Sequence, residues 1–487
     1  MSYLSLTFVA FVALVIILYY GLPKKLRSGV LLVTSLFFYA CFDWRYLIFL
    51  VFTALTTFLG ALLTKKCKSK KLLVGSVIAF NVAVWFAIKE LPWLLSTSSR
   101  AFNLLGVQWK VPTLSFIVPV GLSYFTLQAI AYLVDVAKEK YQGERNFFKY
   151  LLFLSWFPAV IQGPISRYNQ LMPELLNDKK CSFETTRSNL ILILFGLTKK
   201  MVIADRIGIF VNSVFDGASE LQGFILYLGA VAYAIQLYTD FSGCVDICRG
   251  VSGLFGVNLV HNFNRPYLSS SIKEFWGRWH MSLSSWLKDY IYIPLGGNRK
   301  GAFRKYLNII ITFLVSGLWH GAGFNFFLWG GLHAVYQIVG QSTLALRQKI
   351  KKLIGVKQGS VSEKIYQTVI TFNLVTFAWI IFRAGGLVTG FKYIVNMLSS
   401  VNLRELFDGS FFEFGLNQIY LLIIFIHIVF LFIIELCSKS QENVIEGIKN
   451  QHFILRWVIY IVLIFDILLF GVYGSGYDMA SFMYGGF

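Results

Sequence analysis

A series of long apolar runs constrains this chain more than any other feature of its sequence. A bilayer is crossed by roughly 20 predominantly apolar residues, and the chain offers about ten to twelve such runs, because several are broken or fused. They lie near residues 4–20, 28–42, 46–63, 72–95, 113–135, 148–163, 188–214, 224–243, 307–340, 364–382, 417–437 and 453–473. With 56% hydrophobic residues, the chain has more apolar surface than one water-soluble core can bury. We therefore predict an all-α polytopic protein of the cell membrane.

The distribution of basic residues predicts how the chain is oriented in the membrane. The loops at 24–27 and 65–71 are rich in Lys and Arg, whereas the loop at 43–45 holds one acidic and one basic residue. By the positive-inside rule, the N-terminus is then extracytoplasmic, and continued alternation places the C-terminus on the same side. The net charge of +20 lies in loops between apolar runs and not on a folded polar face, which argues against a nucleic-acid partner.

Two polar segments interrupt the apolar pattern. The first, residues 236–250, places Asp240 and Asp246 against an apolar run, and the second, residues 262–301, is dense in Trp, Arg, His, Lys and Asp. Ionisable groups at membrane depth cost a few kcal/mol each on insertion scales, so they usually face a cavity or one another. We therefore expect these segments to line a site.

Part of the second segment has the spacing of an amphipathic helix. Aromatic and apolar side chains recur there at steps of three and four residues, namely Trp279, His280, Leu283, Trp286, Leu287, Tyr290 and Ile291. Two interpretations stay open. The helix could line the site, or it could lie on the membrane surface with Arg278 and Asp289 as interfacial anchors.

A further candidate is the segment 313–336, in which His320 lies inside an apolar stretch beside Trp319 and several glycines. Glycines allow backbones to approach closely or break a helix, which a membrane tolerates where the freed polar groups line a cavity or pack on protein. Packing and catalysis are both open for His320, whereas we expect His333 to be a packing residue. His261, His427 and His452 lie in loops or at membrane edges without a supporting motif.

The residue types in this region favour general-base chemistry. It contains no hydrolase elbow, P-loop or HExxH zinc motif. A histidine without a Ser or Cys nucleophile suits general-base catalysis, in which the imidazole takes a proton from an acceptor hydroxyl. Cys244 and Cys248 are one helical turn apart but have no second pair nearby, so we expect buried apolar residues and no metal site.

Several motifs together resemble those of one family, the membrane-bound O-acyltransferases (MBOAT). The sequence is similar to the bacterial alginate and peptidoglycan O-acetyltransferases and to the teichoic-acid D-alanyl transferases. The motifs that carry the resemblance are PVGLSYFTLQAIAYLVDV (119–136), FPAVIQGPISRYNQLMPEL (157–175), LYTDFSGCVDICRG (237–250), NFNRPY (262–267), FWGRWHMSLSSWLKDYIYIPLGG (275–297) and SGLWHGAG (316–323).

The resemblance implies a fold and a set of site residues. The family fold is a helical membrane body around a central funnel or tunnel, with N-terminal helices in residues 1–112, the catalytic core in 113–345 and C-terminal helices with a tail in 346–487. His320 matches the central histidine of the family, and His280 matches the second histidine of this branch. The residues expected to contact substrate are Trp319, Trp279, Arg278, Asp289 and Asp240. The sequence departs from the family pattern at Gly277, where many relatives carry a basic residue, and at Cys244, where an aromatic residue is common.

The C-terminal residues FMYGGF fit the pattern F-x-Y-x-x-F, which resembles the tail of these acetyltransferases and of the small companion protein in D-alanylation. That resemblance implies that Tyr484 carries the acyl group. A phenol with a pKa of about 10 is a better leaving group than a sugar hydroxyl and a poorer one than a thiolate. An alternative is that the tail is only an aromatic anchor at the interface.

The function implied is membrane O-acyl transfer. We expect an acetyl group from cytoplasmic acetyl-CoA, with no cofactor bound permanently, to reach an extracytoplasmic polysaccharide such as alginate, or peptidoglycan. A separate extracytoplasmic acyltransferase is the expected partner. Two alternatives remain, which are D-alanyl transfer to teichoic acid from an acyl-carrier donor, and a transporter without covalent chemistry, for which buried ionisable residues are also typical.

Overall fold

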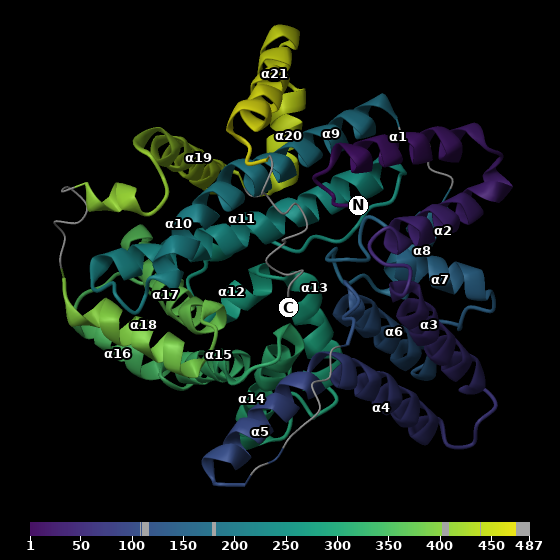
Figure 1. Cartoon of the computed structure of the whole chain (residues 1–487), viewed down its shortest axis with the longest axis horizontal. Helices are drawn as coiled ribbons and strands as arrows, with labels where there is room; N and C mark the ends of the chain where they lie inside the picture. The colour runs from purple at the N-terminus through teal and green to yellow at the C-terminus, as the bar shows by residue number, and fades with distance from the viewer. Residues whose placement is uncertain (108, 110–115, 178–181, 402–408, 439, 474–487) are drawn as a thin grey trace. The chain divides into compact units, whose positions relative to one another are not determined.

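The computed structural model describes residues 1–107, 109, 116–177, 182–401, 409–438 and 440–473, and all regular structure within these ranges is helical (Figure 1). The chain forms two compact units. The first comprises Met1–Ile193 and Cys244–Val260, and the second comprises Leu194–Gly243 and the described residues from His261 onwards. The prediction of an all-α protein is confirmed. The division into 1–112, 113–345 and 346–487 follows the order of the sequence and stays a prediction.

The first unit is built from the N-terminal helices. They are α1 (Leu6–Gly21), α2 (Lys24–Ala40), α3 (Tyr46–Leu63), α4 (Lys70–Lys89), α5 (Leu91–Leu104), α6 (Leu122–Ala137), α7 (Phe147–Ser155), α8 (Tyr168–Leu176) and most of α9 (Phe183–Leu197). Within this unit α2, α3, α6 and α7 pack side by side (Figure 1). Cys244 and Cys248, on the part of α11 that belongs here, are 0% and 1% exposed, which confirms that both are buried.

The second unit contains the polar segment 262–301 and the segment 236–250 as far as Gly243. Its elements are η1 (Thr198–Ala204), α10 (Asp205–Asp216), α11 (Phe224–Leu254) as far as Gly243, η2 (Pro266–Leu268), α12 (Ile272–Arg278), α13 (Met281–Leu287), η3 (Lys288–Tyr292), α14 (Gly301–His320), α15 (Phe324–Ser342), α16 (Leu344–Leu353), α17 (Val361–Arg383), α18 (Leu387–Ser399), η5 (Ser410–Glu413), α19 (Gln418–Cys437), α20 (Gln441–Lys449) and α21 (Phe453–Phe470).

Six helices among the described residues are long and apolar enough to cross a membrane. They are α3, α4, α11, α17, α19 and α21. Most of the apolar window of α11 is buried, at 72%, whereas only 6% of that of α21 is buried. A helix that leaves its apolar side chains exposed on all sides needs an apolar solvent around it, which a bilayer supplies. The central funnel implied by the resemblance stays a prediction.

Some apolar runs are divided differently from the sequence expectation. The run expected at 307–340 is a hairpin of two helices, α14 and α15. The two helices approach closely because glycines face each other's backbone. A Cβ atom at Gly317 would lie 2.3 Å from the Phe326 carbonyl oxygen, and one at Gly330 would lie 2.3 Å from that of Phe313. The glycines that suggested a broken helix therefore also allow the two halves to pack.

A buried group of charges surrounds the π-helix η1 in the second unit. The Lys200 Nζ atom lies 2.7 Å from Asp205 Oδ1 and 2.5 Å from Asp240 Oδ1. All three side chains are less than a tenth exposed, at 3%, 9% and 4% respectively. Because buried charges must be paired, Lys200 accounts for the two carboxylates at this depth. Asp240, expected at the substrate site, is thus held by a lysine of its own chain, and its role toward substrate stays a prediction.

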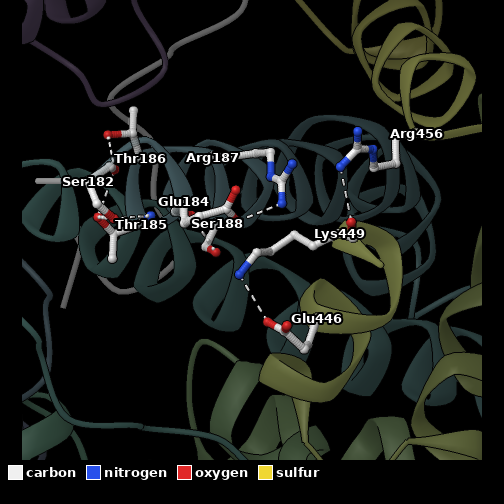
Figure 2. Close-up of polar contacts among 9 residues, drawn as sticks. All are labelled: Ser182, Glu184, Thr185, Thr186, Arg187, Ser188, Glu446, Lys449 and Arg456. Carbon is white, nitrogen blue, oxygen red and sulfur yellow. Dashed lines mark hydrogen bonds and ion pairs between the residues drawn. The ribbon is translucent and has the colours of Figure 1, made fainter. Parts of the chain in front are cut away.

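Basic side chains on α9, α20 and α21 have local partners (Figure 2). On α9, Arg187 forms an ion pair with Glu184. In the second unit, Lys449 on α20 pairs with Glu446, and Arg456 on α21 donates a hydrogen bond to the Lys449 carbonyl oxygen at 3.2 Å. Lys449 at the end of α20 and Arg456 in the first turn of α21 thus place two basic side chains on either side of the short connection between these helices. The side on which each terminus lies stays a prediction.

Candidate functional site

The amphipathic helix expected across residues 279–291 begins later than its spacing indicated. Trp279 is extended, with φ −102° and ψ 130°, and His280 has left-handed backbone angles of φ 43° and ψ 53°. The helix begins only at Met281. The cause lies in Asn262, whose carbonyl oxygen accepts a hydrogen bond from the Met281 N–H, while its side-chain Oδ1 accepts bonds from both the N–H and the hydroxyl of Ser282. These bonds satisfy the N–H groups of Met281 and Ser282, which have no partner within the helix at its N-terminus.

This break in the helix places the His280 imidazole in a fully buried position. Its Nδ1 atom lies 3.3 Å from Asn262 Oδ1, which also accepts from Ser282. An amide oxygen can only accept hydrogen bonds. Nδ1 therefore carries the proton, and Nε2 carries the lone pair. Burial lowers the pKa of His280 to about 3, so the ring is neutral at cellular pH. The low pKa makes this ring a weak base, so His280 is suited to a neutral hydrogen-bonding role and not to taking up the proton itself.

The second histidine, His320, is the last residue of α14 and is 3% exposed. Its ring packs edge-on against Trp319 at 4.8 Å between centroids, against Trp329 at 5.0 Å and against Phe382 at 5.5 Å. Three aromatic rings therefore fix the plane of this imidazole.

The two histidines are brought together by one tryptophan. The Trp319 ring lies 5.9 Å from that of His280 and 4.8 Å from that of His320. The His280 ring also packs edge-on against Phe241 on α11, at 4.8 Å. The imidazole that precedes α13 and the one that ends α14 thus pack on the same buried indole, an arrangement that excludes water from both rings.

The other residues predicted for the site lie around this centre with different partners. Trp279 is 1% exposed and packs on Phe275 at 5.5 Å. Arg278 forms an ion pair of 2.6 Å with Glu274, and Asp289 is half-buried in η3. Their contacts with substrate stay predictions. Tyr484 lies outside the described residues.

Two acidic residues inside the C-terminal apolar helices, Glu435 on α19 and Asp466 on α21, were not singled out by the sequence patterns. His427, expected in a loop or at a membrane edge, lies in the middle of α19, so that expectation was wrong. The Tyr238 hydroxyl donates to the Glu435 carboxylate, and Arg265 donates to the Glu435 carbonyl oxygen at 3.3 Å. His427 Nε2 lies 2.8 Å from Asp466 Oδ1, which joins α19 to α21. The signal that could have found them is an acidic residue inside an apolar run, since such residues need a partner within the membrane.

We expect His280→Asn to reduce acyl transfer, but less than loss of His320 does. Asparagine tolerates left-handed backbone angles better than alanine does, so this variant removes the imidazole with little backbone strain. His280→Ala should in addition lower the free energy of unfolding by about 1–2 kcal/mol, because alanine in this conformation is strained. Transfer activity per folded protein and thermal unfolding in detergent measure the two effects separately. Equal activity of His280→Asn and wild type would assign the imidazole to packing alone.

Comparison with known proteins gives one family and several relatives. Residues 38–382 match the MBOAT, membrane-bound O-acyltransferase family. The chain is 34% identical over 395 residues to the peptidoglycan O-acetyltransferase of Helicobacter pylori, which covers 73% of this chain and 72% of that protein. It is 33% identical to the probable alginate O-acetylase AlgI of Pseudomonas aeruginosa, over 78% of this chain and 72% of the relative. It is also 27% identical to the teichoic acid D-alanyltransferase of Bacillus subtilis, over 54% of this chain and 68% of that protein.

Proposed function

Because the chain belongs to the membrane-bound O-acyltransferase family, we propose that it passes an acetyl group from cytoplasmic acetyl-CoA to an extracytoplasmic polysaccharide or peptidoglycan. It is a multi-pass membrane enzyme, and its family membership excludes the transporter that the sequence patterns left open. The acetyl group is supported by the similarity to proteins named as O-acetyltransferase and O-acetylase, which extends over more of the chain than the similarity to the D-alanyltransferase.

The observation that carries this proposal is the burial of His320 beside Trp319 and His280. In the proposed step, the His320 imidazole takes the proton of an acceptor hydroxyl as its oxygen attacks the thioester carbonyl carbon. The carbon–sulfur bond then breaks, and the leaving thiolate receives the proton from the imidazolium. The products are an oxygen ester and the free thiol of CoA, so the histidine returns to its neutral state.

We further propose that Tyr484 is the first acceptor and delivers the acetyl group to a separate extracytoplasmic acyltransferase. Support comes from the point where the described chain ends. The Val472 N–H donates to the Met201 carbonyl oxygen at 3.1 Å, and Arg206 donates to that of Phe470, which anchors the end of α21 within the unit that contains His320. Eleven residues, 474–484, lead from this anchored end to Tyr484, and a chain of that length spans at most about 36–40 Å when extended.

The alternative is D-alanyl transfer to teichoic acid, which the similarity to a teichoic acid D-alanyltransferase favours. Deleting the gene and treating the purified cell envelope with mild alkali separates the two, because alkali releases ester-bound acyl groups. The proposal predicts that released acetate falls while released D-alanine is unchanged, and that the wild-type gene restores the acetate. A loss of D-alanine with normal acetate would replace the proposal by the alternative.

A further inference from the structure

His333 on α15 is buried within the second unit, and neither the proposed chemistry nor the expected substrate contacts involve it. The side chain is 0% exposed. Its ring is surrounded by aromatic rings from four helices, namely Phe275 and Trp276 on α12, Phe313 on α14, Trp329 and Tyr336 on α15 and Trp379 on α17. Simple packing would be served equally well by phenylalanine at this position, so the hydrogen bond that the imidazole makes is informative.

That hydrogen bond determines the state of the ring. The Trp276 Nε1–H group donates to His333 Nδ1 at 3.2 Å. Because an indole nitrogen can only donate, Nδ1 must carry the lone pair, and His333 is a neutral imidazole with its proton on Nε2. The bond joins α12, which precedes the His280 turn, to α15, which follows His320 along the chain. His333 therefore connects the two segments that carry the site histidines.

His333 also shares a neighbour with His320. The Trp329 ring lies 5.0 Å from the His333 ring and 5.0 Å from the His320 ring, and it meets His320 edge-on at 90°. Trp276 packs on the same indole at 5.8 Å. Trp276, His333 and His320 thus all pack on Trp329.

The Trp329 indole and the backbone next to it are closely packed. Trp329 stacks on Trp379 at 5.5 Å and 20° between ring planes, and a Cβ atom at the next residue, Gly330, would lie 2.3 Å from the Phe313 carbonyl oxygen. Close-packed interiors transmit small displacements instead of absorbing them. A shift of Trp276 or His333 therefore reaches the His320 ring through Trp329.

We propose that His333 is a positioning residue for His320, acting through Trp329, and that the hydrogen bond from Trp276 holds it in place. This inference rests on the proposed role of His320 as the base. A base displaced by about 1 Å can cost 10²-fold in rate, so loss of the bond should lower kcat by roughly 10- to 100-fold. The KM for acetyl-CoA should not change, because the proposed role gives His333 no contact with the donor.

Two substitutions of His333 separate the hydrogen bond from packing. His333→Phe keeps an aromatic ring but has no acceptor, whereas His333→Asn places an amide oxygen near the position of Nδ1 and keeps the acceptor. His452→Phe is the control, since His452 is an exposed histidine before α21. Each full-length variant is expressed in a strain that lacks the wild-type gene. Inverted membrane vesicles, which retain the extracytoplasmic partner and the wall polymer, are assayed for release of CoA thiol from acetyl-CoA, and rates are normalised to folded protein. We expect kcat to fall in the order wild type, Asn, Phe, with the control at the wild-type value.

A double-mutant cycle with Trp276→Phe completes the test. Trp276→Phe should lower kcat on its own, and should lower it little further in the His333→Phe background, where the bond is already lost. If His333→Phe does not accumulate in the membrane, the kcat of Trp276→Phe is compared with that of the His452→Phe control. A lower kcat in Trp276→Phe then supports the inference. Wild-type kcat in these variants would overturn the inference. A raised KM for acetyl-CoA with an unchanged kcat would overturn it as well. His320→Ala is measured alongside, because activity in that variant would instead overturn the proposed base.

Discussion

His320→Ala is expected to abolish acyl transfer, with a loss of about 10²-fold or more, while the chain still accumulates in the membrane. The imidazole is the proposed acceptor of the hydroxyl proton, and alanine has no group that can take it. The measurement is ester-bound acetate in the cell envelope, compared at equal protein abundance. The loss should appear in kcat, because the proton is transferred in the transition state and not on binding.

A second variant distinguishes chemistry from packing at this position. The His320 ring packs on Trp319, Trp329 and Phe382, so alanine also removes aromatic contacts. His320→Phe keeps an aromatic ring of similar size but cannot accept a proton, and we expect it to be as inactive as His320→Ala. Recovery of activity in His320→Phe would mean that the ring serves packing and that the base lies elsewhere.

Tyr484→Phe is expected to cause near-complete loss of polymer acylation at a normal protein level. The substitution keeps the aromatic ring and deletes only the hydroxyl that would carry the acetyl ester. In the wild type, mass spectrometry of the C-terminal peptide should detect an added acetyl group when the extracytoplasmic partner is absent and the ester cannot be passed on.

The control for this variant is another tyrosine near the C-terminal end. The Tyr473 hydroxyl donates to the Ile467 carbonyl oxygen at 3.3 Å, within the last turns of α21, and the side chain is 48% exposed. Tyr473→Phe should therefore leave acylation unchanged. Full activity in Tyr484→Phe would eliminate the tyrosine relay, and His320 would then have to activate some other acceptor hydroxyl.

Hydropathy and spacing predicted the class of this protein because both depend on local composition. Runs such as 46–63, 417–437 and 453–473 correspond closely to α3, α19 and α21. The polar segments were also visible, since charged and aromatic residues at 236–250 and 262–301 stand out against an apolar background. These segments hold most of the side chains that the structure gathers near His280.

What local patterns could not predict depends on contacts between distant residues. The spacing from Trp279 onward indicated one helix, yet Asn262 bonds the backbone of Met281 and turns His280 out of it. Likewise, the pairing of His333 with Trp276 needs α12 and α15 to pack together, which no periodicity reveals. The meeting of His280 and His320 around a single indole is a property of the packing between these helices.

Covalent transfer of the acetyl group that depends on His320 is the central proposal, and one measurement tests it most directly. The full-length chain is reconstituted in proteoliposomes and supplied with acetyl-CoA that carries a radiolabel in its acetyl group. We predict alkali-labile label bound covalently to the wild-type protein or to added wall polymer, and none with His320→Ala. Equal covalent label in the two proteins, or no covalent label in the wild type, would contradict the account.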